Sequence, residues 1–106
     1  MSTNKYERFV IYKIYQPEIP EMIYVGGTTN FSQRKSNHKK NTTNRVSKKY
    51  HYPLYQYIRN CGGFDKFTIE IVEKCPCKTK MDTLRKEQEI IDFLKPQLNT
   101  IKAIKK

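Results

Sequence analysis

The stretch FVIYKIYQPEIPEMIYVGGTTNFSQRKSNH, residues 9–38, decides the fold. It contains two runs rich in β-branched and aromatic residues, Phe9–Tyr15 and Met22–Gly26, and each run predicts a β-strand. The segment between the runs contains two prolines, which cannot donate hydrogen bonds to a strand ladder. The sequence therefore predicts a loop there and an antiparallel hairpin around it.

The register of this hairpin determines where two tyrosines lie. If Tyr15 pairs with Glu21, then Tyr12 lies directly opposite Tyr24. Residues that oppose each other project from the same face of a sheet, so both hydroxyls would share one surface. A slip of one residue would move one of them to the other face.

The remaining chain predicts three helices and one further strand. Asn30 or Thr29 can cap a helix, and Gln33 three residues after Asn30 fits a capping pattern. Pro53 suits the first turn of a further helix. Thr79 with Asp82 is a second capping signal. The helices are expected over Phe31 to about Lys39, from Pro53 to the stop at Gly62-Gly63, and from Thr79 to Pro96; the third strand is expected over Phe67–Ile71.

Two of these helices carry an apolar side. The last one is predicted to bury a stripe with Glu87 beside it, at the edge of whatever the helix covers. The expected buried positions are Leu54, Tyr57 and Ile58 in the middle helix, and Met81, Leu84, Ile91 and Leu94 in the last helix.

Positive charge is concentrated in one segment of the chain. There are 21 Lys and Arg against 10 Asp and Glu, a formal net charge of +11, and no acid occurs between Met22 and Phe64. That window contains Arg34, Lys35, Lys39, Lys40, Arg45, Lys48, Lys49 and Arg59. Such clustering favours a polyanionic partner, most often nucleic acid, over a merely soluble basic surface. A membrane partner is not expected, because no basic amphipathic helix stands out.

Bulk properties limit the class of protein. A chain of 106 residues has room for one modest core, so residues 1–106 are expected to form a single domain. No apolar run approaches the roughly 18 residues that span a membrane, and the N-terminus lacks the apolar run of a signal peptide. An intracellular protein, cytoplasmic or nuclear, is the expectation.

The pair Cys75 and Cys77 is too closely spaced for the usual zinc site, and these thiols are interpreted as turn and edge residues.

At this point the chain resembles a known family, the GIY-YIG nuclease domain. The resemblance lies in Val10-Ile11-Tyr12, Tyr24-Val25-Gly26, Arg34 with His38 four residues later, Glu87, and Asn99 twelve residues after that. It extends over about residues 9–100 and leaves a short basic C-terminal tail. Val10 stands where the family name has glycine, and Val25 is a conservative change. The resemblance implies an α/β domain of the α+β type, with a three-stranded antiparallel sheet flanked by about three helices.

The resemblance also implies an endonuclease that hydrolyses DNA phosphodiesters with Mg²⁺ or Mn²⁺, leaving 5′-phosphate and 3′-hydroxyl ends. Glu87 would hold the metal, since Mg²⁺ needs few protein carboxylates when phosphate and water supply the rest. Arg34 would bind phosphate oxygens through its planar fork. Tyr12 would be the general base, which requires a pKa lowered by Arg34, Lys13 or the metal.

Supporting roles fall to the other matching residues. Tyr24 would shape the site, His38 would donate to the phosphate or share the proton transfer, and Asn99 would brace the site by hydrogen bonding. The residues expected to bind nucleic acid are Lys13, Lys35, Lys39, Lys40, Arg45, Lys48 and Lys49. Their phosphate contacts would make the affinity salt-dependent.

Two other functions compete with this prediction. One is a non-catalytic nucleic-acid-binding module on the nuclease scaffold, whose hallmark would be a lost metal ligand, and Glu87 is present. The other is a basic protein-interaction domain with no affinity for nucleic acid. The sequence leaves open whether the target is duplex or branched DNA, and whether targeting uses a homodimer or a separate partner. Homing, repair, restriction and mobile-element roles all remain open.

Overall fold

The computed structural model describes residues 4–100, so the basic tail lies outside the described residues. The strands are β1 (Val10–Gln16), β2 (Ile19–Thr28) and β3 (Thr68–Lys74), and the α-helices are α1 (Phe31–Thr43), α2 (Pro53–Asn60) and α3 (Lys80–Leu94). Short 3-10 segments lie at Lys5–Arg8, Phe64–Lys66 and Gln97–Asn99. None of the helices within residues 4–100 is long and apolar enough to cross a membrane.

The three strands form one antiparallel sheet in the order β2-β1-β3, which confirms the predicted fold class. β1 occupies the centre because its residues are apolar on both faces. Ile11, Tyr12 and Ile14 are each 0% exposed. A central strand is covered on both faces and has no free edge, so it takes the most continuously hydrophobic segment of the chain. β2 is left as an edge strand.

The predicted register of the hairpin is wrong by two residues. Tyr24 lies opposite Ile14, and Tyr12 lies opposite Gly26. β2 begins before Pro20 and is irregular there, since the partner of β1 jumps from Ile23 to Ile19. Proline has no N–H for the ladder, so an irregular edge is where a strand tolerates it. A shift of two residues preserves the face, and the Tyr12 and Tyr24 rings lie 6.5 Å apart.

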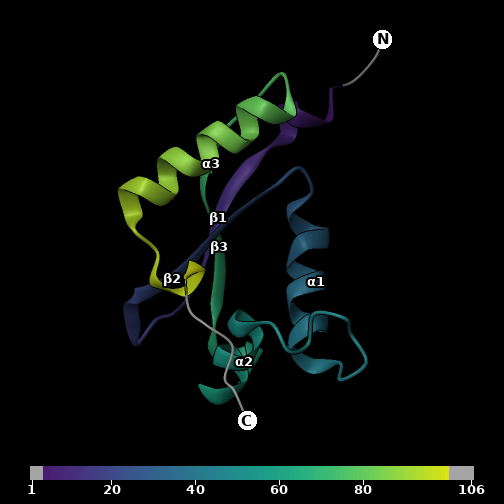
Figure 1. The fold of residues 1–106 in the computed structure, drawn as a ribbon, viewed down its shortest axis with the longest axis vertical. Helices are drawn as coiled ribbons and strands as arrows, with labels where there is room; N and C mark the ends of the chain where they lie inside the picture. The colour runs from purple at the N-terminus through teal and green to yellow at the C-terminus, as the bar shows by residue number, and fades with distance from the viewer. Residues whose placement is uncertain (1–3, 101–106) are drawn as a thin grey trace.

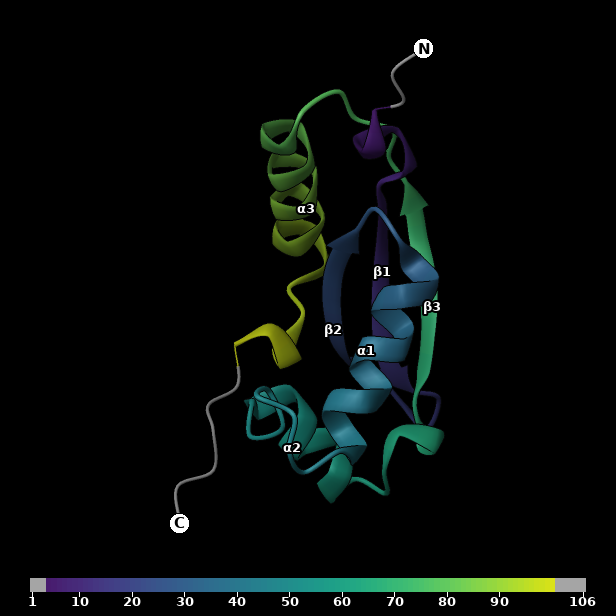
Figure 2. The ribbon, with the colours of Figure 1, turned by 90° about the vertical axis from the view of Figure 1, so that its right-hand side faces the viewer.

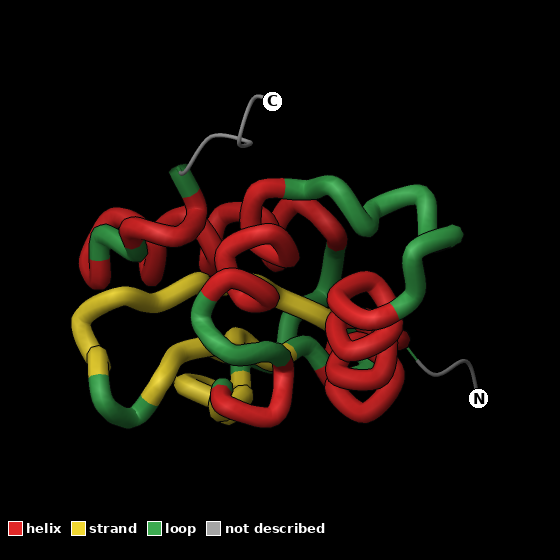
Figure 3. The backbone as a smooth tube through the Cα atoms, turned by 90° about the horizontal axis from the view of Figure 1, so that it is seen from below, coloured by secondary structure: helices red, strands yellow, loops and turns green. Residues whose placement is uncertain are grey.

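Helices cover both faces of the sheet (Figures 1 and 2). α1 and α2 lie over the face of Tyr12, where the core contains Tyr12, Ile14, Leu54, Tyr55, Ile58, Ile69 and Leu98. α3 lies over the other face, where the core contains Phe9, Ile11, Ile23, Val25 and Cys75, packed against Ile90, Ile91 and Leu94. Cys75, which directly follows the edge strand β3, is therefore buried in this core. In Figure 3 the loop that joins α1 to α2 stands out at the upper right.

The helix ends follow the predicted caps, with one difference in length. Asn30 accepts a hydrogen bond from Gln33 N over 3.1 Å, and Thr79 accepts one from Asp82 N over 3.2 Å. α1 continues to Thr43 instead of ending near Lys39. Its last turns are held by the buried side chains of His38 and Thr42, so packing extends a helix that polarity alone would have ended earlier.

The buried sides of α2 and α3 match the prediction at Leu54, Ile58, Ile91 and Leu94 and differ from it elsewhere. In α2 the deeply buried aromatic is Tyr55, while Tyr57 is only partly buried. In α3 Met81 and Leu84 are 63% and 52% exposed. The face that meets the sheet contains Thr83, Glu87, Ile90, Ile91 and Leu94. Glu87 therefore lies within the sheet-facing stripe of the helix, not beside it.

Candidate active site

Tyr12 begins a buried chain of hydrogen bonds. Its hydroxyl lies 2.7 Å from His38 Nε2, and His38 Nδ1 lies 2.8 Å from the Tyr55 hydroxyl. Asn41 Nδ2 donates to the same Tyr55 hydroxyl over 3.3 Å. Tyr55 and His38 line an open hollow. The chain of hydrogen bonds therefore connects the interior hydroxyl of Tyr12 with a surface that solvent reaches.

His38 is held in its neutral form. Burial, together with the nearby cations Arg34 and Lys49, lowers the pKa of its imidazole to about 4. A neutral imidazole has one nitrogen that donates and one that accepts. Because both ring nitrogens lie against hydroxyls, His38 can accept a proton on one side and release one on the other.

The pKa of Tyr12 moves in the direction opposite to the one that a base needs. Burial is the largest cause and raises it, and the neighbouring Tyr24 adds to the rise. The charge of Arg34 and its hydrogen bond to the Tyr12 hydroxyl oppose the rise without reversing it. The expected help from Lys13 is absent, because Lys13 projects from the opposite face of β1. Its ammonium lies 3.5 Å from Glu70.

Tyr24 is the more accessible of the two strand tyrosines. It is partly buried, and it lines the same hollow as His38 and Tyr55. Burial raises the pKa of its hydroxyl, Glu87 raises it further, and Arg34 opposes the rise. Tyr24 therefore lies within electrostatic reach of both charged groups of the site, which suits a hydroxyl that orients a substrate.

Two consecutive glycines on β2 make room for functional side chains from opposite faces of the sheet. A Cβ atom at Gly26 would lie 2.5 Å from the Tyr12 hydroxyl oxygen. A Cβ atom at Gly27 would lie 2.6 Å from Glu87 Oε2 and 2.4 Å from the ring of Phe9. Real Cβ contacts are not that short, so any larger residue would displace these groups. The glycine pair therefore lets Tyr12 and Glu87 approach β2 closely.

Glu87 and Arg34 reach this part of β2 from helices on different faces of the sheet. Burial raises the pKa of the Glu87 carboxyl, whereas the Arg34 charge and a hydrogen bond from the Gly27 N–H lower it. Arg34 is exposed. It lines both a hollow of about 610 Å³ beside Tyr24 and a smaller one of about 250 Å³ beside Glu87. Arg34 thus connects the two sides of the site.

Asn99 holds the edge of β2 at Val25, the residue between Tyr24 and Gly26. Its Oδ1 accepts a hydrogen bond from Val25 N over 2.8 Å, and its Nδ2 donates to Val25 O over 2.8 Å. Val25 lies on the outer edge of an edge strand, where its backbone groups have no strand partner. The amide of Asn99 thus satisfies both groups at the residue between Tyr24 and Gly26.

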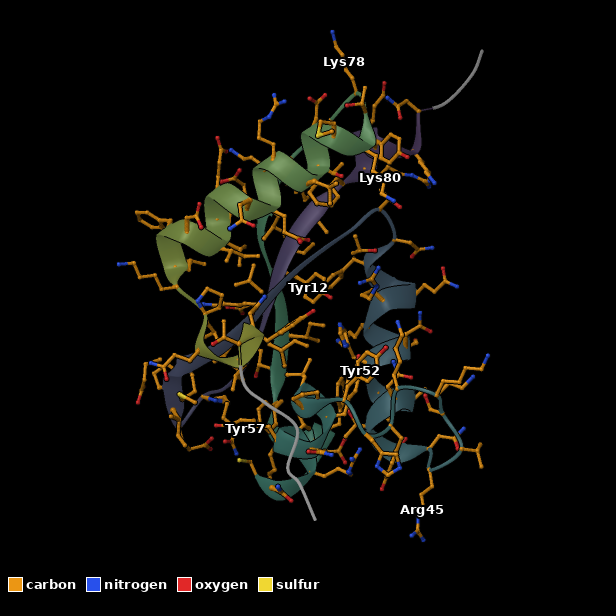
Figure 4. All side chains as sticks on the ribbon, in the orientation of Figure 1. Tyr12, Arg45, Tyr52, Tyr57, Lys78 and Lys80 are labelled. Carbon is orange, nitrogen blue, oxygen red and sulfur yellow. The ribbon has the colours of Figure 1, made fainter. Side chains whose placement is uncertain are left out.

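The basic residues that are predicted to bind nucleic acid lie in different parts of the surface. Lys40, Lys48 and Lys49 line the larger hollow with Arg34. Lys35, Lys39 and Arg45 are exposed but do not line it. Figure 4 shows Tyr12 in the interior between the sheet and α1, whereas Arg45 points away from the molecule. Lys13 lies on the other side of the sheet.

Sequence reasoning missed Tyr55 and Asn41. The available signal was the spacing of α2, where Leu54, Tyr55 and Ile58 form one helical face. Nothing in the sequence indicates that this face meets His38, because α1 and α2 are joined by a loop without a regular pattern. The position of Lys13 on the face opposite to Tyr12 is predictable from the sequence, because neighbouring residues of a strand project to opposite faces.

Glu87 fits a divalent cation that takes most of its ligands from substrate and water. Its carboxylate is half-buried against the Gly27 backbone, in a space that a Cβ would fill. Residues 4–100 contain no group of three or more His, Cys, Asp or Glu side chains that could hold a metal together. Mg²⁺ is commonly bound through one or two carboxylates plus phosphate oxygens and water. A single carboxylate facing an arginine is compatible with that arrangement.

Comparison with known families identifies the domain. Residues 8–102 match the GIY-YIG catalytic domain. That range covers nearly the whole chain, so the protein belongs to the GIY-YIG family of nuclease-type domains. Comparisons with curated proteins and with solved structures gave no significant match. The family membership supports a nuclease function of this general type.

Proposed function

We propose that the protein is an endonuclease that hydrolyses DNA phosphodiester bonds with the help of one divalent cation, Mg²⁺ or Mn²⁺. One observation carries the proposal: Tyr12 lies against Gly26 and Glu87 against Gly27 of β2, and Arg34 is close enough to lower the pKa of both side chains. The family assignment supports the reaction class.

Arg34 would bind the scissile phosphate. Its exposed guanidinium lies between the two hollows, so a phosphate there has Tyr24 on one side and Glu87 on the other. The planar fork can bridge two phosphate oxygens. Lys40, Lys48 and Lys49 continue the positive surface along the larger hollow, and they would hold the neighbouring phosphates of the strand.

Tyr12 and His38 would remove the proton from the attacking water. With a raised pKa, Tyr12 keeps its own proton at neutral pH, so it can accept another only by passing its own to His38 Nε2. His38 can then release its Nδ1 proton toward Tyr55. A bound phosphate offsets the Arg34 charge, one of the causes that lower the pKa of His38. Substrate binding would therefore make His38 a better proton acceptor.

Glu87 would hold the divalent cation, which would neutralise the charge that develops on the phosphate oxygens. Burial raises the pKa of the Glu87 carboxyl, and Arg34 and the Gly27 N–H oppose that rise, which favours the ionised carboxylate that this role needs. The water oxygen attacks phosphorus, and the bond to the 3′ oxygen breaks. That oxygen takes a proton from solvent. The products carry 5′-phosphate and 3′-hydroxyl ends.

The test is a plasmid-nicking assay with Mg²⁺ or Mn²⁺ at low salt. The wild type should nick, and Glu87→Ala and Arg34→Ala should lose about a thousandfold in rate or more, as expected for charge-stabilising groups. Glu89→Ala is the matched control. Glu89 is an exposed carboxylate on the same helix, 3.7 Å from Lys86, and its removal should leave nicking intact.

Three results would contradict the proposal in whole or in part. Binding to DNA without nicking, whatever the metal and substrate, would identify a non-catalytic nucleic-acid-binding module. Neither binding nor nicking at low salt would point to a protein-interaction domain. Equal loss in Glu87→Ala and Glu89→Ala would remove Glu87 from the metal site.

A further inference from the structure

The larger hollow, called here the α1–α2 hollow, continues the site away from Arg34. It lies between the second half of α1, residues 44–52 and the start of α2, and its volume is about 610 Å³. Pockets for small organic ligands are typically about 300–1,000 Å³. Tyr24, Arg34 and His38 form part of its lining. A phosphate bound by Arg34 would therefore place its neighbouring nucleoside at the mouth of this hollow.

The lining of the hollow has the chemistry that recognises a nucleobase. Tyr52 is 51% exposed, and its ring lies nearly parallel to that of Tyr55, with 23° between the planes and 6.4 Å between the centroids. The two rings are stacked, and Tyr52, the exposed one of the two, forms the aromatic wall of the hollow. Amide side chains line the hollow as well: Asn37, Asn41 and Asn44. No acid is found among its lining residues within the described part of the chain.

The wall is held in place by Arg59, a basic residue that the nuclease site does not use. Its guanidinium donates to Thr42 O over 3.0 Å and to Tyr50 O over 2.7 Å. It also lies 3.6 Å from the centre of the Tyr50 ring. One side chain of α2 thus ties the end of α1 to the loop that precedes Tyr52, so the hollow is formed without a ligand.

We propose that the α1–α2 hollow receives an unpaired nucleobase next to the scissile phosphate. The base stacks on Tyr52, and its polar edge meets the asparagine amides. Lys49, whose ammonium lies over the Tyr52 ring at 6.0 Å from its centre, moves from the ring to the flanking phosphate. This rests on the proposed nuclease function and names its substrate class. That class is DNA with an unpaired nucleotide at the cleavage position, such as a bulge, a flap or a mismatch.

The preference for an unpaired base follows from the free-energy cost of removing a base from a duplex. A base inside a duplex must be unpaired and unstacked before it can enter a pocket, and this cost is least for a base that is already unpaired. Stacking on one aromatic side chain gains about tenfold or somewhat more in affinity. For a paired base the cost of unpairing consumes part or all of this gain, whereas for an unpaired base the gain is almost entirely retained.

The experiment compares two oligonucleotide duplexes of the same sequence, one fully paired and one with a single unpaired nucleotide beside the cleaved bond. The wild type should cleave the second about tenfold faster. Tyr52→Ala should bring the ratio of the two rates close to one, while Tyr52→Phe, which keeps the stacking face, should preserve it. Lys48→Ala should slow both substrates equally, because it removes only a charge.

A binding measurement separates this proposal from the nuclease proposal. With 2-aminopurine as the unpaired base, binding of Glu87→Gln protein should quench its fluorescence through stacking, and the added Tyr52→Ala change should abolish the quenching. Quenching without any cleavage by the wild type would support the base site and reject the nuclease function. A rate ratio and quenching that are the same in Tyr52→Ala and wild type would overturn the base site. Circular dichroism melting establishes that each variant is folded.

Discussion

The two groups of functional side chains around β2 lie in contrasting environments. The first group, Tyr12, His38 and Tyr55, is buried and neutral, and its members are joined by hydrogen bonds of 2.7 and 2.8 Å. The second group, Arg34 and Glu87, is charged and remains exposed or half-buried. Neutral groups can move protons in a dry interior at little cost, whereas charges must stay near water to remain ionised. The division between the groups therefore matches a division between proton transfer and phosphate binding.

The sharpest test of this division compares the two tyrosines. Tyr12→Phe should lower the cleavage rate by about two to three orders of magnitude, the range for loss of a general base. Tyr24→Phe should lower it less, because Tyr24 orients the substrate. DNA binding should survive in both. Single-turnover cleavage with a parallel binding titration measures this. A larger loss in Tyr24→Phe would transfer the base role to Tyr24, which lines the open hollow.

The neutral state of His38 predicts a loss of stability in acid. Its pKa is about 4 in the folded protein and about 6.5 when unfolded, so between these values the unfolded chain binds more protons. The free energy of unfolding should therefore fall as the pH drops from about 6.5 to about 4, by on the order of 3 kcal/mol. The facing groups Tyr12, Tyr55, Arg34 and Lys49 give protonated His38 no compensating carboxylate.

Urea unfolding at several pH values checks this prediction. His38→Gln should flatten the dependence in that window, and His51→Gln, which changes an exposed histidine, should keep the wild-type slope. The same slope in His38→Gln and in the wild type would mean that other groups cause the acid sensitivity.

Substitutions at Gly26 and Gly27 can displace Tyr12 and Glu87 separately. Gly26→Ala brings a Cβ against Tyr12, and Gly27→Ala brings one against Glu87 and Phe9. Each should cost about 1–3 kcal/mol of stability through overpacking, measured by urea unfolding. Both should lose cleavage, but added Mn²⁺ should restore only Gly27→Ala, where the carboxylate has moved. Equal recovery of both variants would mean that the two glycines do not serve separate groups.

The smallest expected effect belongs to Asn99. Asn99→Ala removes the two hydrogen bonds to Val25, at a cost of about 1–2 kcal/mol. Asn99→Asp keeps the acceptor for Val25 N–H but not the donor, and it should fall in between. Thermal unfolding measures the series, with Asn60→Ala as the control at an exposed position. An Asn99→Ala variant as stable as the control would show that the β2 edge is held by other contacts.

Local patterns in the sequence predict most of the fold. The strands, the helix caps at Asn30 and Thr79 and the glycine stop after α2 depend on residues within a few positions of one another. The predictions are wrong where a contact between distant segments determines which side chains are buried. The predicted stripe of α3 is right at Ile91 and Leu94 but wrong at Met81 and Leu84. The helix turns Thr83 and Glu87 to the sheet instead, because the carboxylate fits the space left by Gly27.

The sequence by itself determines which chemical groups the protein has and which elements carry them. It specifies two tyrosines on one face of a hairpin, an arginine and a histidine one turn apart, a glutamate on the last helix, and a basic segment without acids. Those properties follow from residue type and from the periods of strand and helix, which act over a few residues.

Only the tertiary structure decides how these groups meet and how they ionise. Packing puts Tyr55 on His38, sends Lys13 to the other face from Tyr12, and brings Glu87 to Gly27 across some sixty residues of chain. It also determines the pKa values of Tyr12 and His38, because burial is the largest cause of both shifts. The depth to which these two side chains are buried depends on contacts between distant segments, which no local pattern encodes.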